Sequence, residues 1–165
     1  MKTRLVLVLV TLLVLLLAGS TPAAAGRDMR VPFVAYYAMH PVIVGTDVNG
    51  CNIQQLPGEG RATHLHESTF YSDAKACPGI WVQSGDGEWT AANGDKLFGD
   101  FVGTFTITMT PEGPVADFEG TYTMDGGTGQ FKDYTGSGIY WGSAEIARPG
   151  GDTGELYFFG TLTRP

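Results

Sequence analysis

The stretch DKLFGDFVGTFTITM, residues 95–109, shows the clearest pattern in the chain. Side chains at alternate positions of an extended chain share one face. Here one face is apolar or glycine and the other is mixed, which is typical of an antiparallel strand with one buried face. The residues of the apolar face are Leu97, Gly99, Phe101, Gly103, Phe105, Ile107 and Met109.

The pair Asn93-Gly94 directly precedes this stretch. Asn-Gly favours a two-residue type I′ hairpin turn, which needs a positive φ at both positions. We therefore expect residues 87–92 to pair with residues 95–109. Working outward, further period-two segments bounded by turn residues predict strands at 31–39, 50–56, 61–71, 79–89, 115–124, 135–146 and 155–163.

Within residues 79–89, the run Ser84-Gly85-Asp86-Gly87 predicts a bulge or an inserted turn. About eight strands with short links and no crossover helix indicate an all-β fold, an eight-stranded antiparallel β-barrel. Many strand glycines suit a small, strongly coiled barrel. A two-sheet sandwich is the alternative.

The N-terminus resembles a secretory signal peptide. Lys2 and Arg4 precede an apolar run at residues 5–17, and small residues follow up to Ala25. The run is shorter than the roughly 20 residues of a membrane span. We predict cleavage after Ala25, a single barrel domain at residues 26–165, and a secreted, periplasmic or cell-envelope location without stable membrane insertion. An uncleaved anchor is the alternative.

The chain is acidic, with 10 Lys and Arg against 17 Asp and Glu and a formal net charge of −7. This charge argues against nucleic acid or anionic lipid as a partner. Cys51 and Cys77 are the two cysteines, and an exported chain usually pairs them. Closing a loop of about 25 residues should stabilise the fold by roughly 3 kcal/mol.

Two pairs of residues are candidates for a metal site or for acid–base catalysis. On an extended chain His64 and His66 share a face, and a third ligand such as His40 would complete a metal site. One structural and one surface histidine is the more ordinary interpretation, so we predict no metal. Asp117 and Glu119 share a face opposite Phe118 and Tyr122 and are expected to face solvent, which argues against a paired-carboxylate hydrolase.

Glycines at 126, 127 and 129 allow a tight reversal before Phe131 and Tyr134. The three-residue spacing of this aromatic pair predicts one helical turn that plugs a barrel end. The segment lacks a lysine directly after its last glycine and a following long helix, both of which a phosphate-binding loop needs.

The motif Gly-Gly-Thr-Gly-Gln-Phe at 126–131 resembles the hallmark of plant dirigent proteins. With other segments it also resembles a group of uncharacterised bacterial proteins with a barrel similar to that of allene oxide cyclase. His66, Gln130 and the run 84–87 depart from that pattern. The other segments that carry the resemblance are residues 60–65, 91–97, 103–104, 135–138 and 160–162.

The resemblance implies an eight-stranded barrel with an apolar cavity, but no catalytic residue and no cofactor. We expect an exported barrel, without enzymatic activity, that binds a small apolar ligand. A cyclase or isomerase that shapes a substrate in the cavity is one alternative, and a structural or protein-interaction module of the cell envelope is another. The candidate pocket residues are His64, Phe101, Phe105, Phe118, Tyr122 and Trp141.

Overall fold

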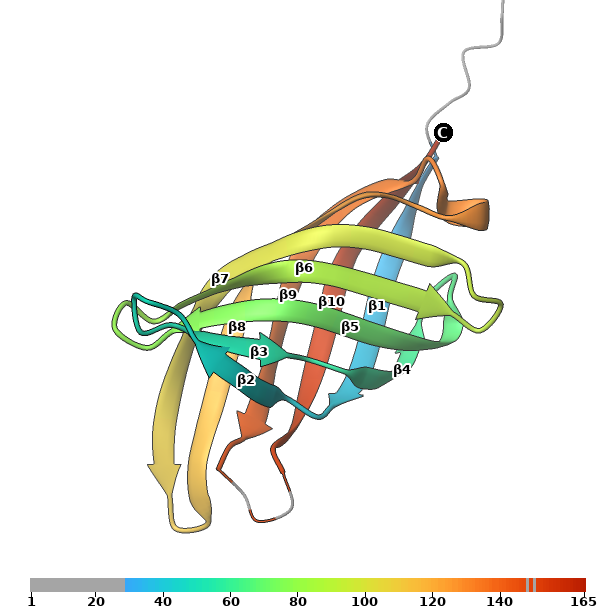
Figure 1. Cartoon of the computed structure of the whole chain (residues 1–165). Coiled ribbons are helices and arrows are strands. Elements are labelled where there is room, and N and C mark those ends of the chain that lie inside the picture. Colours follow the sequence, from blue (N-terminus) through green and yellow to red (C-terminus); the bar gives the residue numbers. More distant parts are fainter. Residues whose placement is uncertain (1–28, 148, 150) are drawn as a thin grey trace, which may run out of the picture.

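The computed structural model describes residues 29–147, 149 and 151–165. The predicted export signal at residues 1–25 lies outside this part of the chain. The described residues form strands and one short 3-10 turn, η1, and contain no helix long and apolar enough to cross a membrane (Figure 1). The strands are β1 (Met29–Met39), β2 (Val42–Thr46), β3 (Asn52–Gln55), β4 (Gly58–Ala62), β5 (His66–Cys77), β6 (Val82–Ala91), β7 (Lys96–Thr110), β8 (Gly113–Gly127), β9 (Thr135–Glu145) and β10 (Thr153–Arg164).

All ten described strands belong to one antiparallel sheet, and eight of them close a ring. Around the ring the order is β1, β10, β9, β8, β7, β6, β5 and β4, after which β4 pairs with β1 again. The all-β antiparallel fold predicted from the sequence is therefore confirmed, in a single sheet rather than in the two sheets of a sandwich.

The largest differences from the predicted strands concern β2, β4 and β5. β2 and β4 were not expected, and β5 begins at His66 and runs to Cys77 instead of occupying 61–71. The predicted interruption at Ser84–Gly87 is wrong, because β6 runs through it and pairs with both neighbours. Gly85 and Gly87 make room for aromatic rings, since an added Cβ would lie 3.0 Å from Phe101 and 2.6 Å from Trp89.

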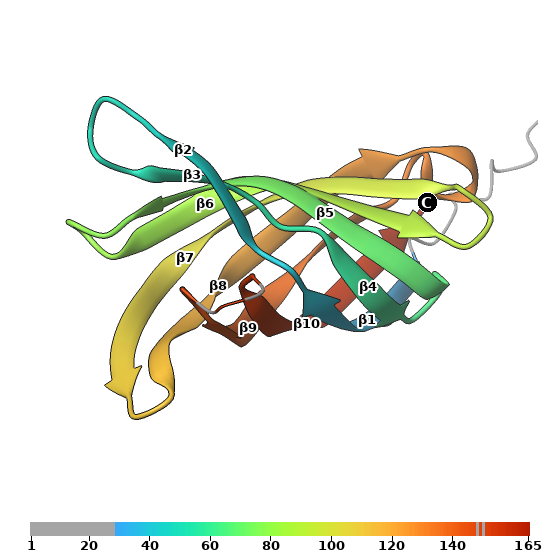
Figure 2. The same cartoon turned by 60° about the horizontal axis from the view of Figure 1, so that its bottom comes forward.

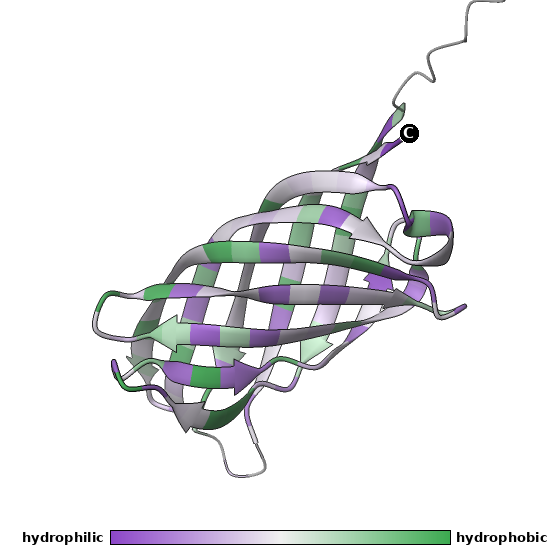
Figure 3. Ribbon diagram, turned by 45° about the horizontal axis from the view of Figure 1, so that its top comes forward, coloured by the Kyte–Doolittle hydropathy of each residue, from purple (hydrophilic) through white to green (hydrophobic). Residues whose placement is uncertain are grey.

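The alternation of β7 holds over most of its length. Leu97, Phe101 and Phe105 are buried, whereas Ile107 and Met109 are 38% and 75% exposed. β6 pairs with β7 only up to Thr104, whereas β7 and β8 stay paired to the end of their hairpin. The tip of the β7–β8 hairpin therefore projects beyond the ring (Figure 1). Along the strands, apolar and polar residues alternate, as Figure 3 shows.

The β6–β7 hairpin is present, but its turn is not type I′. Gly94 has a φ of 88°, whereas Asn93 is not among the residues with positive φ. Instead, the Ala91 N–H donates to the Asp95 carbonyl over 2.9 Å, which makes a longer loop. One glycine in the left-handed region is enough for this loop, so the two-residue turn is not needed.

One end of the ring is closed. The turn η1 (Gly129–Phe131) carries the buried Phe131, whose ring packs edge-on against Tyr134 at 5.5 Å. The helical turn is therefore shorter than predicted, because it ends before Tyr134. The Gln130 N–H donates to the Asp95 carboxylate over 3.2 Å and holds the turn against the start of β7. Next to this closed end, the interior of the ring is packed with large side chains, which include Tyr37, Phe70, Trp89 and Phe158.

At the opposite end the ring does not close, because the last part of β5 pairs with β3 instead of β4, and the β2–β3 hairpin stands away from the ring (Figure 2). β4 pairs with the first half of β5 and β3 pairs with residues 73–76 of the same edge, whereas β2 pairs with β3 alone. As predicted, Cys51 and Cys77 form a disulfide, with an S–S distance of 2.11 Å. It ties the start of β3 to the end of β5.

Candidate functional site: a cavity at the open end

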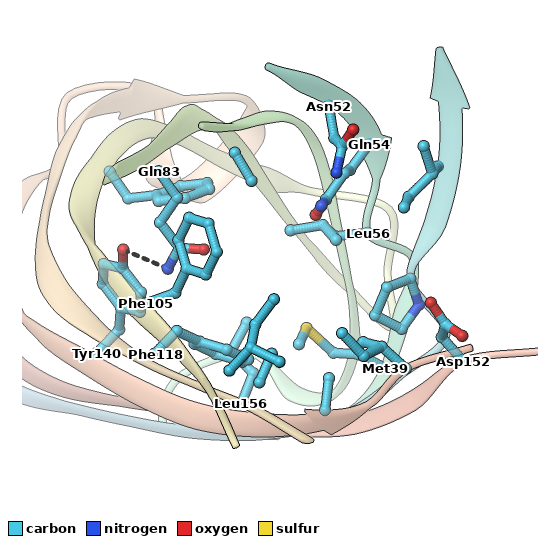
Figure 4. Close-up of a pocket in the computed structure, with 18 of the residues that line it drawn as sticks. Met39, Asn52, Gln54, Leu56, Gln83, Phe105, Phe118, Tyr140, Asp152 and Leu156 are labelled. Carbon is cyan, nitrogen blue, oxygen red and sulfur yellow. Dashed lines mark hydrogen bonds between the residues drawn. The ribbon is translucent and has the colours of Figure 1, made fainter. Parts of the chain in front are cut away.

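A cavity of about 320 Å³ occupies the open half of the ring. It exists because the aromatic side chains that pack the closed half stop at the level of Phe70 and Phe158, which line it. Its walls come from both the ring and the β2–β3 hairpin, and they include Ile43 of β2 and Asp152 of the loop before β10. Figure 4 shows this lining. Most of the lining is aliphatic or aromatic, including Met39, Leu56, Phe105, Phe118 and Leu156.

Tyr140 of β9 provides the inner wall with a hydroxyl group. Its side chain lies along the inner face of β8 and β7, where it crosses two glycines, Gly120 and Gly103. A Cβ built on Gly120 would lie 2.7 Å from the ring, and one on Gly103 would lie 2.3 Å from the hydroxyl. The two glycines therefore let the side chain lie flat and reach β6, where Gln83 Nε2 donates to its oxygen over 3.0 Å.

Burial raises the pKa of Tyr140 to about 12, although the hydrogen bond from Gln83 lowers it in part. The hydroxyl is therefore neutral and carries its proton at ordinary pH. No lysine, arginine or histidine lines the cavity among the described residues. Its one carboxylate is Asp152, and the amides of Asn52 and Gln54 lie across from Gln83 and Tyr140 (Figure 4).

The Gln83–Tyr140 pair keeps unused hydrogen-bonding capacity. The Tyr140 oxygen accepts from Gln83, so its own proton is available to a third group, as is the Gln83 carbonyl. If the amide were turned over, the tyrosine would donate to Gln83, leaving its lone pairs and an amide N–H available. In either arrangement the pair offers at least one donor and at least one acceptor to the cavity.

Of the six pocket candidates from the sequence, Phe101, Phe105 and Phe118 line the cavity. Tyr122 lies deeper, in the packed half, where it is 1% exposed and contacts Trp89 and Phe158. Its hydroxyl has no hydrogen-bond partner in the described part of the chain. The period-two pattern placed Tyr122 on the inner face, but depth along the ring decides whether an inner residue meets the cavity.

Trp141 and His64 lie outside the cavity. Trp141 is 43% exposed on the outer face, where its ring stacks on Tyr157 at 5.7 Å. His64 sits in the turn between β4 and β5 with a φ of 70°, and its Nε2 is 3.1 Å from the Pro32 carbonyl. His66 follows that turn with a φ of 61°, so the expectation that both histidines share a strand face is wrong.

No group of three His, Cys, Asp or Glu side chains that could hold a metal ion occurs in the described ranges. Asp117 and Glu119 are exposed on the outer face of β8, as predicted.

The polar lining was missed by sequence reasoning. Gln83, Asn52 and Gln54 line the cavity but were not among the predicted site residues. A signal for Gln83 was present, since it shares the alternate positions of Trp89 within one strand. The assumed break at 84–87 hid that relation.

The fold and site define an all-β protein in which eight antiparallel strands ring an apolar cavity open at one end. Comparison with protein-family models, with curated proteins and with solved structures found no match.

Proposed function

We propose that this protein binds a small, mostly apolar molecule in the cavity at the open end of the ring. The observation that carries the proposal is the cavity itself, about 320 Å³ in volume and lined largely by aromatic and aliphatic side chains. Ligand pockets are commonly about 300–1,000 Å³, apolar, and supplied with a few polar groups that orient the ligand. The Gln83–Tyr140 pair is a polar feature of that kind.

Binding is placed ahead of a cyclase or isomerase activity because of the chemistry of the lining. A protonated tyrosine and an amide can orient a ligand, whereas general-base catalysis needs a group that takes up a proton near neutral pH. The described lining contains one carboxylate, Asp152, and no histidine. The resemblance to the allene oxide cyclase barrel stays a prediction, and export is part of the proposal because a disulfide is compatible with an extracellular location.

An interaction module is the rival interpretation. The outer face of β1, β10 and β9 carries an apolar row of which Phe159 is 55% and Ile139 is 51% exposed. Exposed apolar patches of this kind mark interaction sites in some proteins. The cavity, which combines apolar walls with the Gln83–Tyr140 pair, carries the proposal instead.

A neutral fluorescent ketone, Prodan, tests the proposal. We expect saturable binding to the folded protein with a blue-shifted emission. Ala116 of β8 lines the cavity, so Ala116→Trp should fill it and weaken binding by at least about tenfold, a loss of roughly 1.4 kcal/mol.

The matched control is Thr106→Trp, which adds the same side chain at an exposed position of the neighbouring strand. It should bind Prodan like the wild type. Absence of binding by the wild type, or equal binding by all three proteins, would reject the cavity as the binding site.

A further inference from the structure

We infer that the cavity selects a neutral lipophilic alcohol, whose hydroxyl group meets the Gln83–Tyr140 pair. The inference rests on the proposed binding function and assigns the class of ligand. It starts from the pair's capacity to donate one hydrogen bond and to accept another.

A hydroxyl group matches this capacity because it also donates once and accepts. The Tyr140 O–H would donate to the ligand oxygen, and the ligand O–H would donate to the Gln83 carbonyl. A ketone can use only the donor of the pair, and a hydrocarbon can use neither. A hydrocarbon leaves both groups covered by apolar atoms without a partner, which is unfavourable for buried polar groups.

The charge of the described lining disfavours an anionic ligand. A carboxylate that enters an apolar site needs a cation or several donors to offset its loss of water. The described lining has no cationic side chain, and Asp152 adds a negative charge to it. A fatty-acid anion is therefore disfavoured even though its tail would suit the apolar walls.

The position of the pair sets the orientation of the ligand. The Tyr140 ring packs against Phe101 at 5.3 Å and against Phe158 at 6.1 Å, where the cavity meets the packed half of the interior. The ligand hydroxyl therefore lies inside and the hydrocarbon skeleton extends past Phe105 and Leu156. A cavity of about 320 Å³ holds on the order of ten water-sized groups, which suits a compact monocyclic alcohol.

The test compares p-menthane, menthone, menthol and the corresponding menthane carboxylate, which share one carbon skeleton. Each displaces Prodan from the wild type, from Tyr140→Phe and from Gln83→Met. We expect each variant to weaken menthol by about fivefold to tenfold, the effect of one net hydrogen bond, and p-menthane by less than about twofold. The carboxylate should bind at least about tenfold more weakly than menthol at neutral pH.

Tyr122→Phe is the matched control, because it removes the same hydroxyl from a buried tyrosine outside the cavity. It should leave all four affinities unchanged. Equal losses for menthol and p-menthane in Tyr140→Phe and in Gln83→Met, no loss in either, or a carboxylate as tight as menthol would overturn the inference. If Prodan and p-menthane bind the wild type in those cases, the proposed function stands and only the preference for an alcohol fails. If neither binds the wild type, the proposed function itself fails.

Discussion

At the scale of residues, the interior is shaped by tyrosine rings that lie flat on glycines. Tyr140 lies over Gly120 and Gly103, and Tyr122 lies in the same way over Gly138, where a Cβ would come within 2.8 Å of its ring. A ring that lies along the wall takes little of the interior space, whereas a ring that stands on it would fill the middle. Gly120 and Gly103, under the Tyr140 ring that lines the cavity, therefore keep space in the open half.

Replacing Gly120 by alanine should destabilise the fold. The new Cβ would lie 2.7 Å from the Tyr140 ring, 2.6 Å from Gly103 Cα and 2.2 Å from the Val102 carbonyl oxygen. Overpacking of this kind costs about 1–3 kcal/mol, to be measured as the change in the free energy of unfolding in urea.

Gly45→Ala in β2 is the control, because its Cβ would meet nothing within 4 Å. It should be neutral or slightly stabilising, since alanine restricts the unfolded chain. A Gly120→Ala variant as stable as Gly45→Ala would show that the wall yields easily.

At the scale of elements, the β2–β3 hairpin stands out because it forms part of the cavity wall without belonging to the ring. β2 pairs with one strand only and is exposed along its whole length. Its connection to β3 is held by Asp47, which forms an ion pair with Lys75 and accepts hydrogen bonds from the backbone N–H groups of Asn49 and Cys51. The Lys75 ammonium, chiefly, holds the pKa of Asp47 below its usual value.

The disulfide should carry much of the stability of this element. Cys51 and Cys77 are 26 residues apart in the chain, and the double variant Cys51→Ser/Cys77→Ser should lose about 3 kcal/mol of stability by the chain-entropy account. Urea unfolding of oxidised wild type and of the variant measures the loss.

Wild type under reducing conditions should match the variant. If reduction leaves the unfolding midpoint unchanged, backbone pairing of β3 with β5 is sufficient to hold the hairpin.

How far the sequence predicts these elements depends on their burial. β7 and β8 were found because one face of each is apolar and the other polar. β2 escaped because all five of its residues are exposed, so no alternation marks it, and β4 escaped because Gly58 and Gly60 resemble turn residues. The inward position of Gln83 was not predicted, because Gly85 and Gly87 were interpreted as a break in the strand. In a single sequence, a glycine that makes room for an aromatic ring cannot be distinguished from a glycine in a turn.

At the scale of the whole molecule, stability should fall in alkaline solution. Burial raises the pKa of Tyr37, Tyr122 and Tyr140, in the last case to about 12 from an ordinary 10.0. Above the ordinary value the unfolded chain has released these protons while the folded chain retains them, so the free energy of unfolding falls as pH rises.

We expect little pH dependence from these groups below about pH 9 and a steep decline above about pH 10. Urea unfolding at a series of pH values measures it, and tyrosinate absorbance should rise for the three buried tyrosines only as the chain unfolds. Stability that holds unchanged well above about pH 10 would contradict the assignment.

The division of the interior has a consequence for how this chain can evolve. The half packed around Trp89 and closed by Phe131 maintains the fold, whereas the half lined by Tyr140 contains the cavity in which we propose that a ligand binds. Substitutions of cavity-lining residues would then change which ligand binds without unfolding the chain. Related proteins with different ligands would need only a few substitutions in the same fold.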